Sequence, residues 1–291
     1  MNSLLAIAHS IGAHPLTRDA QLGAWARFAT WQVRSRLNRE AVMPWIGGQR
    51  LIVRRGMTGA TGNLYFGLHE FMSMGFVLHF LREGDLFLDA GANIGSYTLL
   101  ASGICRATTL AIEADADTSH DLARNIEING LANLAKVLTV ALGPSDGEAF
   151  FTTGRGAMNQ VVSTSGENVR VVPQRSLDNI VGDDEPAMLK LDVEGFEEQV
   201  LSGASRLLEK PGFKAILLEG TSPPTLKLFE AHGFERAFYD PFTRLLQRTP
   251  NELAFSNGQW TLSNEFFVRD WDFVESRMAT AKPVTIFGRK I

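Results

Sequence analysis

Four carboxylate residues of this chain stand directly after stretches that predict β-strands. They are Asp89, Glu113, Asp192 and Glu219, which follow the apolar stretches 86–88, 109–112, 187–191 and 214–218. Helix-like segments separate these stretches, and strands that alternate with helices predict a parallel, doubly wound sheet. The carboxyl ends of parallel strands meet at one edge of such a sheet, where ligands bind. We therefore expect the four acids to gather at one site, as proton acceptors or as hydrogen-bond acceptors for a ligand.

A glycine-studded turn follows the first of these strands. Gly91 and Gly95 allow the backbone to approach a ligand closely and to adopt dihedral angles closed to other residues. A dinucleotide-binding fingerprint needs glycine at its first, third and sixth positions. Here those positions hold Gly91, Asn93 and Ser96, so a nicotinamide dinucleotide is a poor match to the turn.

The acid that ends the second strand suits a nucleoside. Glu113 follows Gly95 by 18 residues, and an acid at this point can accept hydrogen bonds from both ribose hydroxyls, in NAD and S-adenosylmethionine (SAM) sites alike. Asp89 is placed to hold the glycine turn and the ammonium group of a cofactor's amino-acid part. A purely structural Asp89, which caps the turn, is the alternative.

Three motifs together resemble one enzyme family. The Asp-x-Gly-x-Asn-x-Gly pattern at 89–95 is similar to the first motif of SAM methyltransferases. The run Leu-Lys-Leu-Asp-Val-Glu-Gly-Phe-Glu at 189–197, with Val-Leu-Ser-Gly-Ala at 200–204, closely resembles the signature of the FkbM family of SAM-dependent methyltransferases. So does Glu113 followed by Asn-Ile-x-x-Asn-Gly-Leu at 125–131. The resemblance covers residues 85 to 234.

The resemblance implies an α/β fold with a doubly wound, mostly parallel sheet of seven strands, and SAM as the cofactor. It implies O-methylation of a hydroxyl on a small-molecule or glycan acceptor. The cofactor contacts that it implies are Asp89, Gly91, Asn93, Ile94, Gly95, Glu113, Ala114 and Asp192. A nicotinamide-dependent dehydrogenase, a SAM-binding module without turnover and N-methylation remain as alternatives.

Methyl transfer to a hydroxyl needs alignment of the acceptor and a base for its proton. Asp192 is the first candidate for this base, because the end of the fourth strand in this fold faces the transferred methyl group. Glu194 is the second candidate, and its alternative role is that of a first-turn acid stabilised by the helix dipole. The negative charge of this pair would also favour the sulfonium of the substrate over the neutral product.

A metal-assisted reaction is a second hypothesis. Asp192, Glu194 and Glu219 offer the carboxylate oxygens that a hard divalent cation prefers, and such a cation would lower the pKa of the acceptor hydroxyl. For acceptor binding, the candidates are Glu70 and Asn159, which lie in or beside glycine-rich stretches, and Glu219 at the sheet edge.

Further elements are expected before and after this core. A hairpin is expected over 45–53 because Gly47-Gly48 favours a tight turn. The glycine-rich stretch 54–67 predicts a loop, with a lid over the site as one role. A helix is expected over 70–81. We expect an N-terminal extension at 1–69, a methyltransferase core at 70–247 and a closing strand and helix segment at 248–291.

Residues 1–40 predict a helix that packs on the main domain. Its arginines and tryptophans also suit a membrane surface, but Trp25 and Trp31 are six residues apart and do not share one narrow stripe. Pro44 is expected to end this region.

Composition narrows the classes of protein. The net charge of −4 and the lack of a basic block argue against a nucleic-acid binder. The single cysteine, Cys105, excludes an internal disulfide and fits a reducing compartment. No apolar run approaches the ~20 residues that span a bilayer. We expect a cytoplasmic protein, with its oligomeric state left open.

Overall fold

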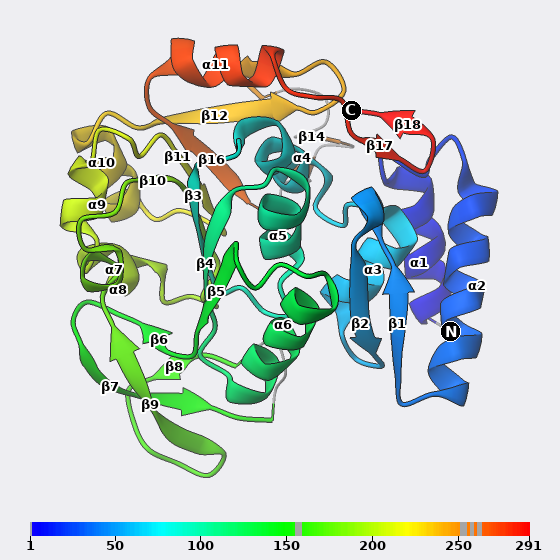
Figure 1. The fold of residues 1–291 in the computed structure, drawn as a ribbon, viewed down its shortest axis with the longest axis horizontal. Coiled ribbons are helices and arrows are strands. Elements are labelled where there is room, and N and C mark those ends of the chain that lie inside the picture. Colours follow the sequence, from blue (N-terminus) through cyan, green and yellow to red (C-terminus); the bar gives the residue numbers. More distant parts are fainter. Residues whose placement is uncertain (1, 155–158, 251–254, 257–258, 261–263) are drawn as a thin grey trace.

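The computed structural model describes residues 2–154, 159–250, 255–256, 259–260 and 264–291. Its centre is an eight-stranded sheet with the order β13-β12-β16-β11-β10-β3-β4-β5 (Figure 1). In that order the strands are Leu245–Gln247, Glu235–Asp240, Glu265–Val268, Ala215–Leu218, Pro186–Leu191, Leu86–Ala90, Thr108–Ile112 and Ala135–Leu138.

The sheet is mostly parallel. Strands β5, β4, β3, β10 and β11 run parallel, whereas β16 is antiparallel to both of its neighbours. The predicted α/β doubly wound fold is confirmed, with one strand more than the seven expected because β13 extends the edge as a hairpin with β12. The chain fills one side of β3 first and then crosses to β10. This change of direction between β3 and β10 is the point where ligands bind in doubly wound sheets.

Helices cover both faces of the sheet. They are α4 (Phe71–Phe80), α5 (Ser96–Thr98), which continues as a π-helical turn at Leu99–Ile104, α6 (Ala116–Ile128), α7 (Leu177–Val181), α8 (Glu197–Ser202), α9 (Ser205–Glu209), α10 (Pro223–Ala231) and α11 (Trp271–Ala279). Consecutive strand residues alternate between faces. Thus Phe87 packs in the cluster under α4 and α11, and Leu88 packs in the cluster under α7 to α10. The helix expected after Asp192 is divided into α8 and α9.

A second, four-stranded sheet lies beside the main one, at the bottom of Figure 1. Its order is β6-β9-β7-β8, with β6 at Ala141–Leu142, β7 at Gly147–Thr152, β8 at Val161–Val162 and β9 at Val169–Arg175. Residues 135–142 are thus divided between two sheets, since β5 belongs to the main sheet and β6 to the smaller one.

The N-terminal segment begins with two helices, α1 (Asn2–Ala13) and α2 (Gln21–Leu37). A hairpin follows, with β1 at Glu40–Pro44, a 3₁₀ turn at Ile46–Gly48 and β2 at Arg50–Arg54. The hairpin prediction is confirmed, but its first strand begins earlier, and Pro44 lies within that strand instead of preceding it. Proline is tolerated there because β1 is an edge strand of a two-stranded sheet.

The prediction of a loop over 54–67 is wrong, because Thr58–Phe66 forms a helix, α3. The side chains of Leu64, Tyr65 and Phe66 are buried. A Cβ added at Gly62 would lie 2.4 Å from Nδ1 of His69, so the glycine lets the helix pack closely against that ring. Tertiary packing therefore outweighs the low helix propensity of the glycines.

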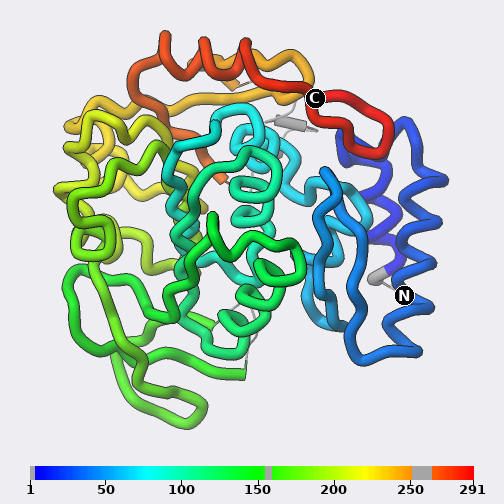
Figure 2. Tube along the Cα trace, viewed as in Figure 1, coloured from blue at the N-terminus to red at the C-terminus, as the bar shows by residue number. Residues whose placement is uncertain are grey.

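The C-terminal hairpin lies beside the N-terminal segment (Figure 2). Its strands are β17 (Thr285–Ile286) and β18 (Arg289–Lys290), and two equally short strands lie earlier in the chain, β14 (Phe255–Ser256) and β15 (Gln259–Trp260). The Arg289 guanidinium donates hydrogen bonds to the carbonyl of Pro15, at 3.0 Å, and to Asp19, at 2.9 Å. Among the helices of the described chain, none is both long and apolar enough to cross a bilayer.

Candidate functional site

The glycine turn begins where three strands of the main sheet end together. Gly91 has φ of +74°, and its backbone N–H donates to the carbonyl of Ile112 at 3.0 Å. A Cβ added at Gly91 would lie only 1.7 Å from the carbonyl oxygen of Asp192. Only glycine therefore fits, because both the backbone angle and the space exclude a side chain.

The rest of the turn leads into α5. Gly95 caps that helix with φ of +94°, and a Cβ there would lie 2.5 Å from Cδ1 of Leu122. Asn93 has φ of +50° and an exposed side chain. Ile94 is buried, and its carbonyl accepts a hydrogen bond from Asn125 at 2.9 Å. Of these predicted cofactor residues, Asn93 offers its side chain to the site, and Ile94 packs its side chain into the protein.

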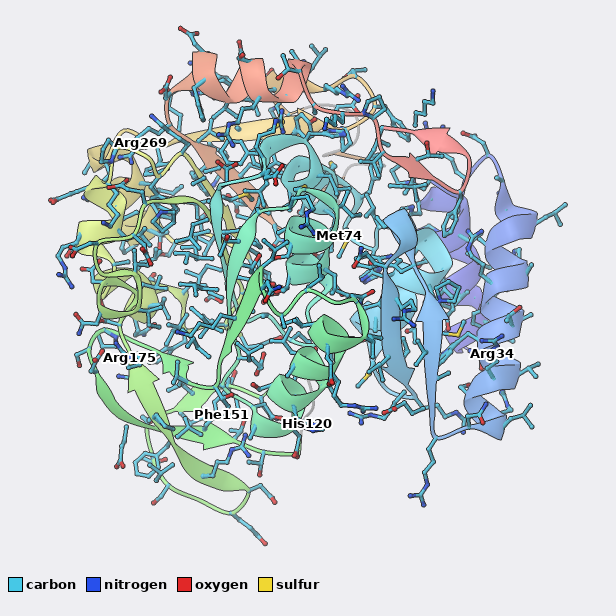
Figure 3. The ribbon with its side chains drawn as sticks, in the orientation of Figure 1. Arg34, Met74, His120, Phe151, Arg175 and Arg269 are labelled. Atoms are coloured by element: carbon cyan, nitrogen blue, oxygen red, sulfur yellow. The ribbon has the colours of Figure 1, made fainter. Side chains whose placement is uncertain are left out.

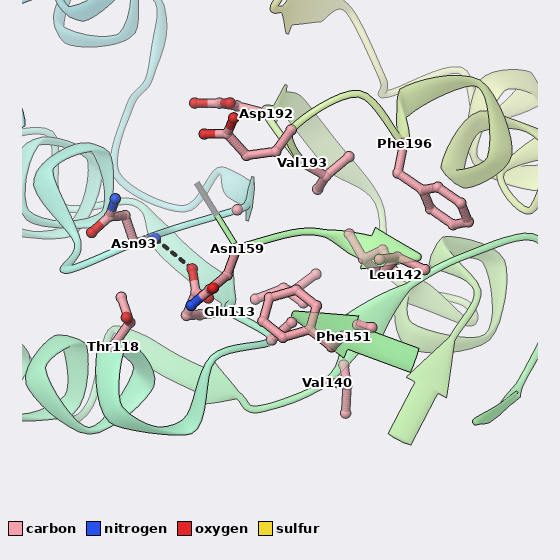
Figure 4. Close-up of a pocket in the computed structure, with 16 residues that line it drawn as sticks. Asn93, Glu113, Thr118, Val140, Leu142, Phe151, Asn159, Asp192, Val193 and Phe196 are labelled. Atoms are coloured by element: carbon pink, nitrogen blue, oxygen red, sulfur yellow. Dashed lines mark hydrogen bonds between the residues drawn. The ribbon is translucent and has the colours of Figure 1, made fainter. Parts of the chain in front are cut away.

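Glu113 holds the turn from the neighbouring strand end. Its carboxylate accepts backbone N–H bonds from Asn93, at 3.0 Å, and from Asp115, at 2.8 Å; Figure 4 marks the first. Burial raises the pKa of Glu113. A carboxylate has about four acceptor positions, so Glu113 retains capacity for further hydrogen bonds from a ligand.

A first cavity lies against Glu113 (Figure 4). It is lined by the ends of β3, β4 and β10, by the start of α6 and by the smaller sheet, with Gly91, Glu113, Ala114, Thr118, Leu142, Phe151, Asn159 and Asp192 among its residues. Asn159, expected near an acceptor, thus lies among the residues predicted to bind the cofactor. Its amide donates to Asp115 at 3.3 Å.

A second cavity of about 410 Å³ continues from the first. Its walls are the β2–α3 segment, the glycine turn and the end of β10, including Arg54, Arg55, Thr58, His69, Glu70, Lys190 and Asp192. Gly91, Asn93, Thr118 and Asp192 line both cavities. Asp192 therefore lies where the two spaces meet.

Sequence reasoning missed Lys190, which orders this junction. Its ammonium donates to the carbonyl of Gly91 at 2.9 Å and to Oδ2 of Asp192 at 3.0 Å, and the residue is only 3% exposed. Burial would lower the pKa of Lys190, but the carboxylates of Asp192, Asp89 and Glu70 raise it above its ordinary value. The sequence feature that could have identified Lys190 is its position as the single charged residue inside the apolar run 187–191.

Asp192 and Glu219 form a carboxyl pair. Burial acts to raise the pKa of Asp192, but Lys190 and a hydrogen bond from Glu219 outweigh it and lower that pKa. The hydrogen bond to Asp192, together with burial, raises the pKa of Glu219 to about 8. At neutral pH, Asp192 is therefore the ionised member of the pair and Glu219 the protonated one.

Glu194 and Glu70 lie on opposite sides of this pair. Glu194 is largely exposed with φ of +55° and lines the first cavity, where partial loss of solvent and the charge of Asp192 raise its pKa. Glu70 lines the second cavity, where it accepts hydrogen bonds from the Tyr97 hydroxyl and from Asn264. Both are thus positioned within the joined cavity.

Asp89 lines neither of these two cavities. It is fully buried, it accepts a hydrogen bond from the Thr98 hydroxyl at 2.6 Å, and it pairs in register with Lys190 on β10. Its Oδ1 has no hydrogen-bond partner among the described residues. Burial raises the pKa of Asp89. This environment favours the structural role over contact with a cofactor ammonium.

The described residues include no group of three or more His, Cys, Asp or Glu side chains arranged to hold a metal ion. Asp192, Glu194 and Glu219 therefore do not form such a group, and the metal hypothesis gains no support from the geometry.

The residues of the joined cavity fit SAM. The first cavity has a carboxylate for ribose hydroxyls, Glu113, and an apolar and aromatic wall of Leu142 and Phe151 for a base. Gly91 and Asn93 of the glycine turn line both cavities, where the amino-acid part of the cofactor would pass.

The chain matches the model of the methyltransferase FkbM domain over residues 89–247. The hexuronic acid methyltransferase AglP of Haloferax volcanii is 28% identical over 146 residues, which are 49% of this chain and 59% of that protein. The chain thus spans less than two thirds of the length of this curated relative.

Two solved structures also resemble the chain. The methyltransferase FkbM of Methylobacillus flagellatus KT is 17% identical with a TM-score of 0.44, over 72% of this chain and 53% of that chain. A SAM-dependent methyltransferase of Thiobacillus denitrificans, in complex with S-adenosyl-L-homocysteine, is 14% identical with a TM-score of 0.35, over 56% and 62%. Similarity at this level says nothing about the chemistry of this chain. The family match alone covers more than half of the 291 residues and agrees with the motifs, and the chain belongs to the FkbM methyltransferase family.

Proposed function

We propose that this protein is a SAM-dependent methyltransferase that methylates a hydroxyl group of a small, sugar-like acceptor. The observation that carries the proposal is the position of Asp192. This residue lines both the first cavity, which fits a nucleoside, and the larger second cavity. In this proposal residues 70–247 form the core, residues 248–291 complete it, and residues 1–69 are an extension that supplies part of the acceptor cavity.

SAM would supply an electrophilic methyl group on a sulfonium. Glu113 would bind the ribose, Ala114 and Phe151 would flank the base, and Gly91 and Asn93, which line both cavities, would border the amino-acid part. The acceptor would occupy the second cavity, bordered by Glu70. The protein would hold the methyl donor and the acceptor hydroxyl in line on either side of Gly91. This alignment of the reacting groups is the largest contribution to the rate that we expect of the protein.

Asp192 would accept the proton of the acceptor hydroxyl. Lys190 fixes one of its oxygens at 3.0 Å and keeps the carboxylate ionised, so the base is in its active form at neutral pH. Glu219 donates its proton to the same carboxylate and limits the charge of the pair to one. Glu194 is the second candidate for the base, since it lines the first cavity near Asp192.

A carbohydrate acceptor is supported by the relative from Haloferax volcanii, which is named a hexuronic acid methyltransferase. The second cavity, at about 410 Å³, is within the range of small-molecule sites and is lined by polar groups from β2 and α3. Both observations favour a sugar-like acceptor, with the methyl group accepted by oxygen.

Calorimetric titration with S-adenosylhomocysteine and, separately, with NAD tests the cofactor. We expect micromolar-range binding of S-adenosylhomocysteine and none of NAD; tight NAD binding would instead support the dehydrogenase alternative. A panel of sugars and uronic acids, followed by detection of S-adenosylhomocysteine with and without a chelator, tests turnover. Binding without turnover on every acceptor would favour a SAM-binding module.

A further inference from the structure

The outer face of α2 is apolar and open to solvent. Leu22, Ala26, Ala29, Val33 and Leu37 recur at intervals of three and four, so they form one stripe along the helix. Leu22, Val33 and Leu37 are 87%, 59% and 76% exposed. Figure 3 shows α2, with Arg34 labelled, at the outer edge of the molecule.

This stripe is distinct from the face that holds α2 to the protein. Ala24, Trp31 and Ser35 are buried and pack toward α3 and the hairpin, so the helix already buries one apolar face. The neighbouring helix α1 adds Leu4 and Leu5, which are 56% and 74% exposed. Apolar side chains that line up on the solvent face of one helix indicate an interaction site more than singly scattered ones do.

Positive charge flanks the stripe. Residues 2–39 contain five arginines and a single acid, Asp19, in a chain whose net charge is −4. Neither α1 nor α2 contains an aspartate or glutamate. Within the described part of the chain, Arg34, Arg36 and Arg39 form no ion pair with a carboxylate. Their charge is thus available to an anionic partner.

We propose that α2 rests on the surface of an anionic phospholipid bilayer, with the Leu22–Leu37 stripe in the acyl boundary and the arginines at the headgroups. An amphipathic helix with apolar side chains on one face and arginine beside them binds membranes in this way without spanning them. A second copy of the chain is a poorer partner, because a two-fold contact would bring together two copies of a surface that carries arginines and whose helices contain no acid.

The proposal has a consequence for the acceptor, which rests on the proposed function. Helix α3 packs against α2, and the first turn of α3 lines the second cavity. The second cavity therefore lies behind two helices, about 20 Å from the proposed membrane face. An acceptor sugar carried on a membrane-embedded lipid would be presented at that depth.

Co-sedimentation of the full chain with vesicles tests the surface. We expect binding to vesicles of phosphatidylcholine with phosphatidylglycerol, weakening as salt rises, and much weaker binding to phosphatidylcholine alone. The triple variant Leu22→Gln, Val33→Gln, Leu37→Gln should bind the anionic vesicles at least about tenfold more weakly. The double variant Arg36→Gln, Arg39→Gln should lose mainly the preference for anionic vesicles, so that it binds the two vesicle types more equally.

Val171→Gln with Leu245→Gln is the matched control, since these apolar side chains are 54% and 55% exposed on other elements. It should bind as the unmodified protein does, and thermal melting should show all variants folded. Failure to bind anionic vesicles at low salt, or equal binding by the triple variant, overturns the proposal. So does light scattering that shows a dimer which the triple variant dissociates. No cofactor or acceptor is needed, so this outcome is independent of methyl transfer.

Discussion

The two joined cavities are built by different parts of the chain. The first is formed by residues between Gly91 and Phe196, all within the region that matches the family. The second takes one wall from that region and the other from β2, α3 and the start of α4, which precede it. Cofactor binding and acceptor choice are thus separable in sequence, and substitutions should affect them separately.

Charge differs between the cavities as well. In the first, Glu113 is fixed by two backbone N–H groups. At the border of the second, Lys190, Asp192 and Glu219 form a coupled group whose protonation depends on each member. The reaction at the junction is therefore expected to follow pH.

The largest effect is expected from Gly91→Ala, because a methyl group there would overlap the Asp192 carbonyl at 1.7 Å. Strand β10 or the turn must move, and we expect S-adenosylhomocysteine affinity to fall by about 10³-fold or more. Gly130→Ala is the control, since φ is +66° there with open space around it. It should cost about 1 kcal/mol of stability and leave binding intact. Titration calorimetry separates the two; unaltered affinity in Gly91→Ala would contradict the site.

Asp192→Asn should impair turnover without impairing cofactor binding. The amide keeps the shape of the carboxylate but cannot take the acceptor proton, so turnover should fall by about 10²-fold or more while S-adenosylhomocysteine still binds. Glu198→Gln, an exposed acid on α8, is the control and should leave turnover unchanged. Steady-state rates and calorimetry on both variants provide the measurement. Full turnover in Asp192→Asn would move the base to Glu194.

The glycine turn and Glu113 of the first cavity and Glu70 of the second could be predicted from sequence, whereas helix α3 could not. Gly91 and Glu113 follow from apolar runs that end in a glycine turn and an acid, signals that lie within a few residues of each other. Helix α3 depends on distant contacts: the Asn63 amide donates to the Ser96 hydroxyl, 33 residues away, and the Tyr65 carbonyl accepts from Arg27, 38 residues away. No local pattern encodes those contacts, so a glycine-rich stretch was expected to be a loop.

Lys190→Gln tests how the positive charge at the junction controls the pKa of Asp192. The amide can still donate to the Gly91 carbonyl but loses the ammonium that holds the pKa of Asp192 down. That pKa should then rise, so Asp192 becomes protonated at higher pH and activity is lost first on the acidic side. We expect about a tenfold loss below neutrality and a smaller one above it. A pH–rate profile that only scales down, without a shift of its acidic limb, would assign Lys190 a purely structural role.

Arg55→Gln should act on the acceptor side alone. The Arg55 side chain is exposed, lines the second cavity, and has no ion pair in the described structure. Loss of its charge should raise the acceptor KM by about threefold to tenfold if the acceptor is a uronic acid, and less for a neutral sugar. S-adenosylhomocysteine affinity should not change. Lys136→Gln, an exposed cation on β5, is the control. A change in cofactor affinity would contradict the separation of the cavities.

Glu219→Gln should give the smallest effect, seen in stability rather than in activity. The folded-state pKa of Glu219, about 8, lies above its unfolded value of 4.5, so the folded protein binds this proton more tightly. The resulting stabilisation is complete below pH 4.5 and is lost as pH rises toward 8, where a second charge forms beside Asp192. The neutral amide cannot ionise, so melting temperatures measured between these pH values should fall less steeply in the variant. Parallel curves for the two proteins would mean that Asp192 and Glu219 do not share a proton, and that the junction carries two independent charges.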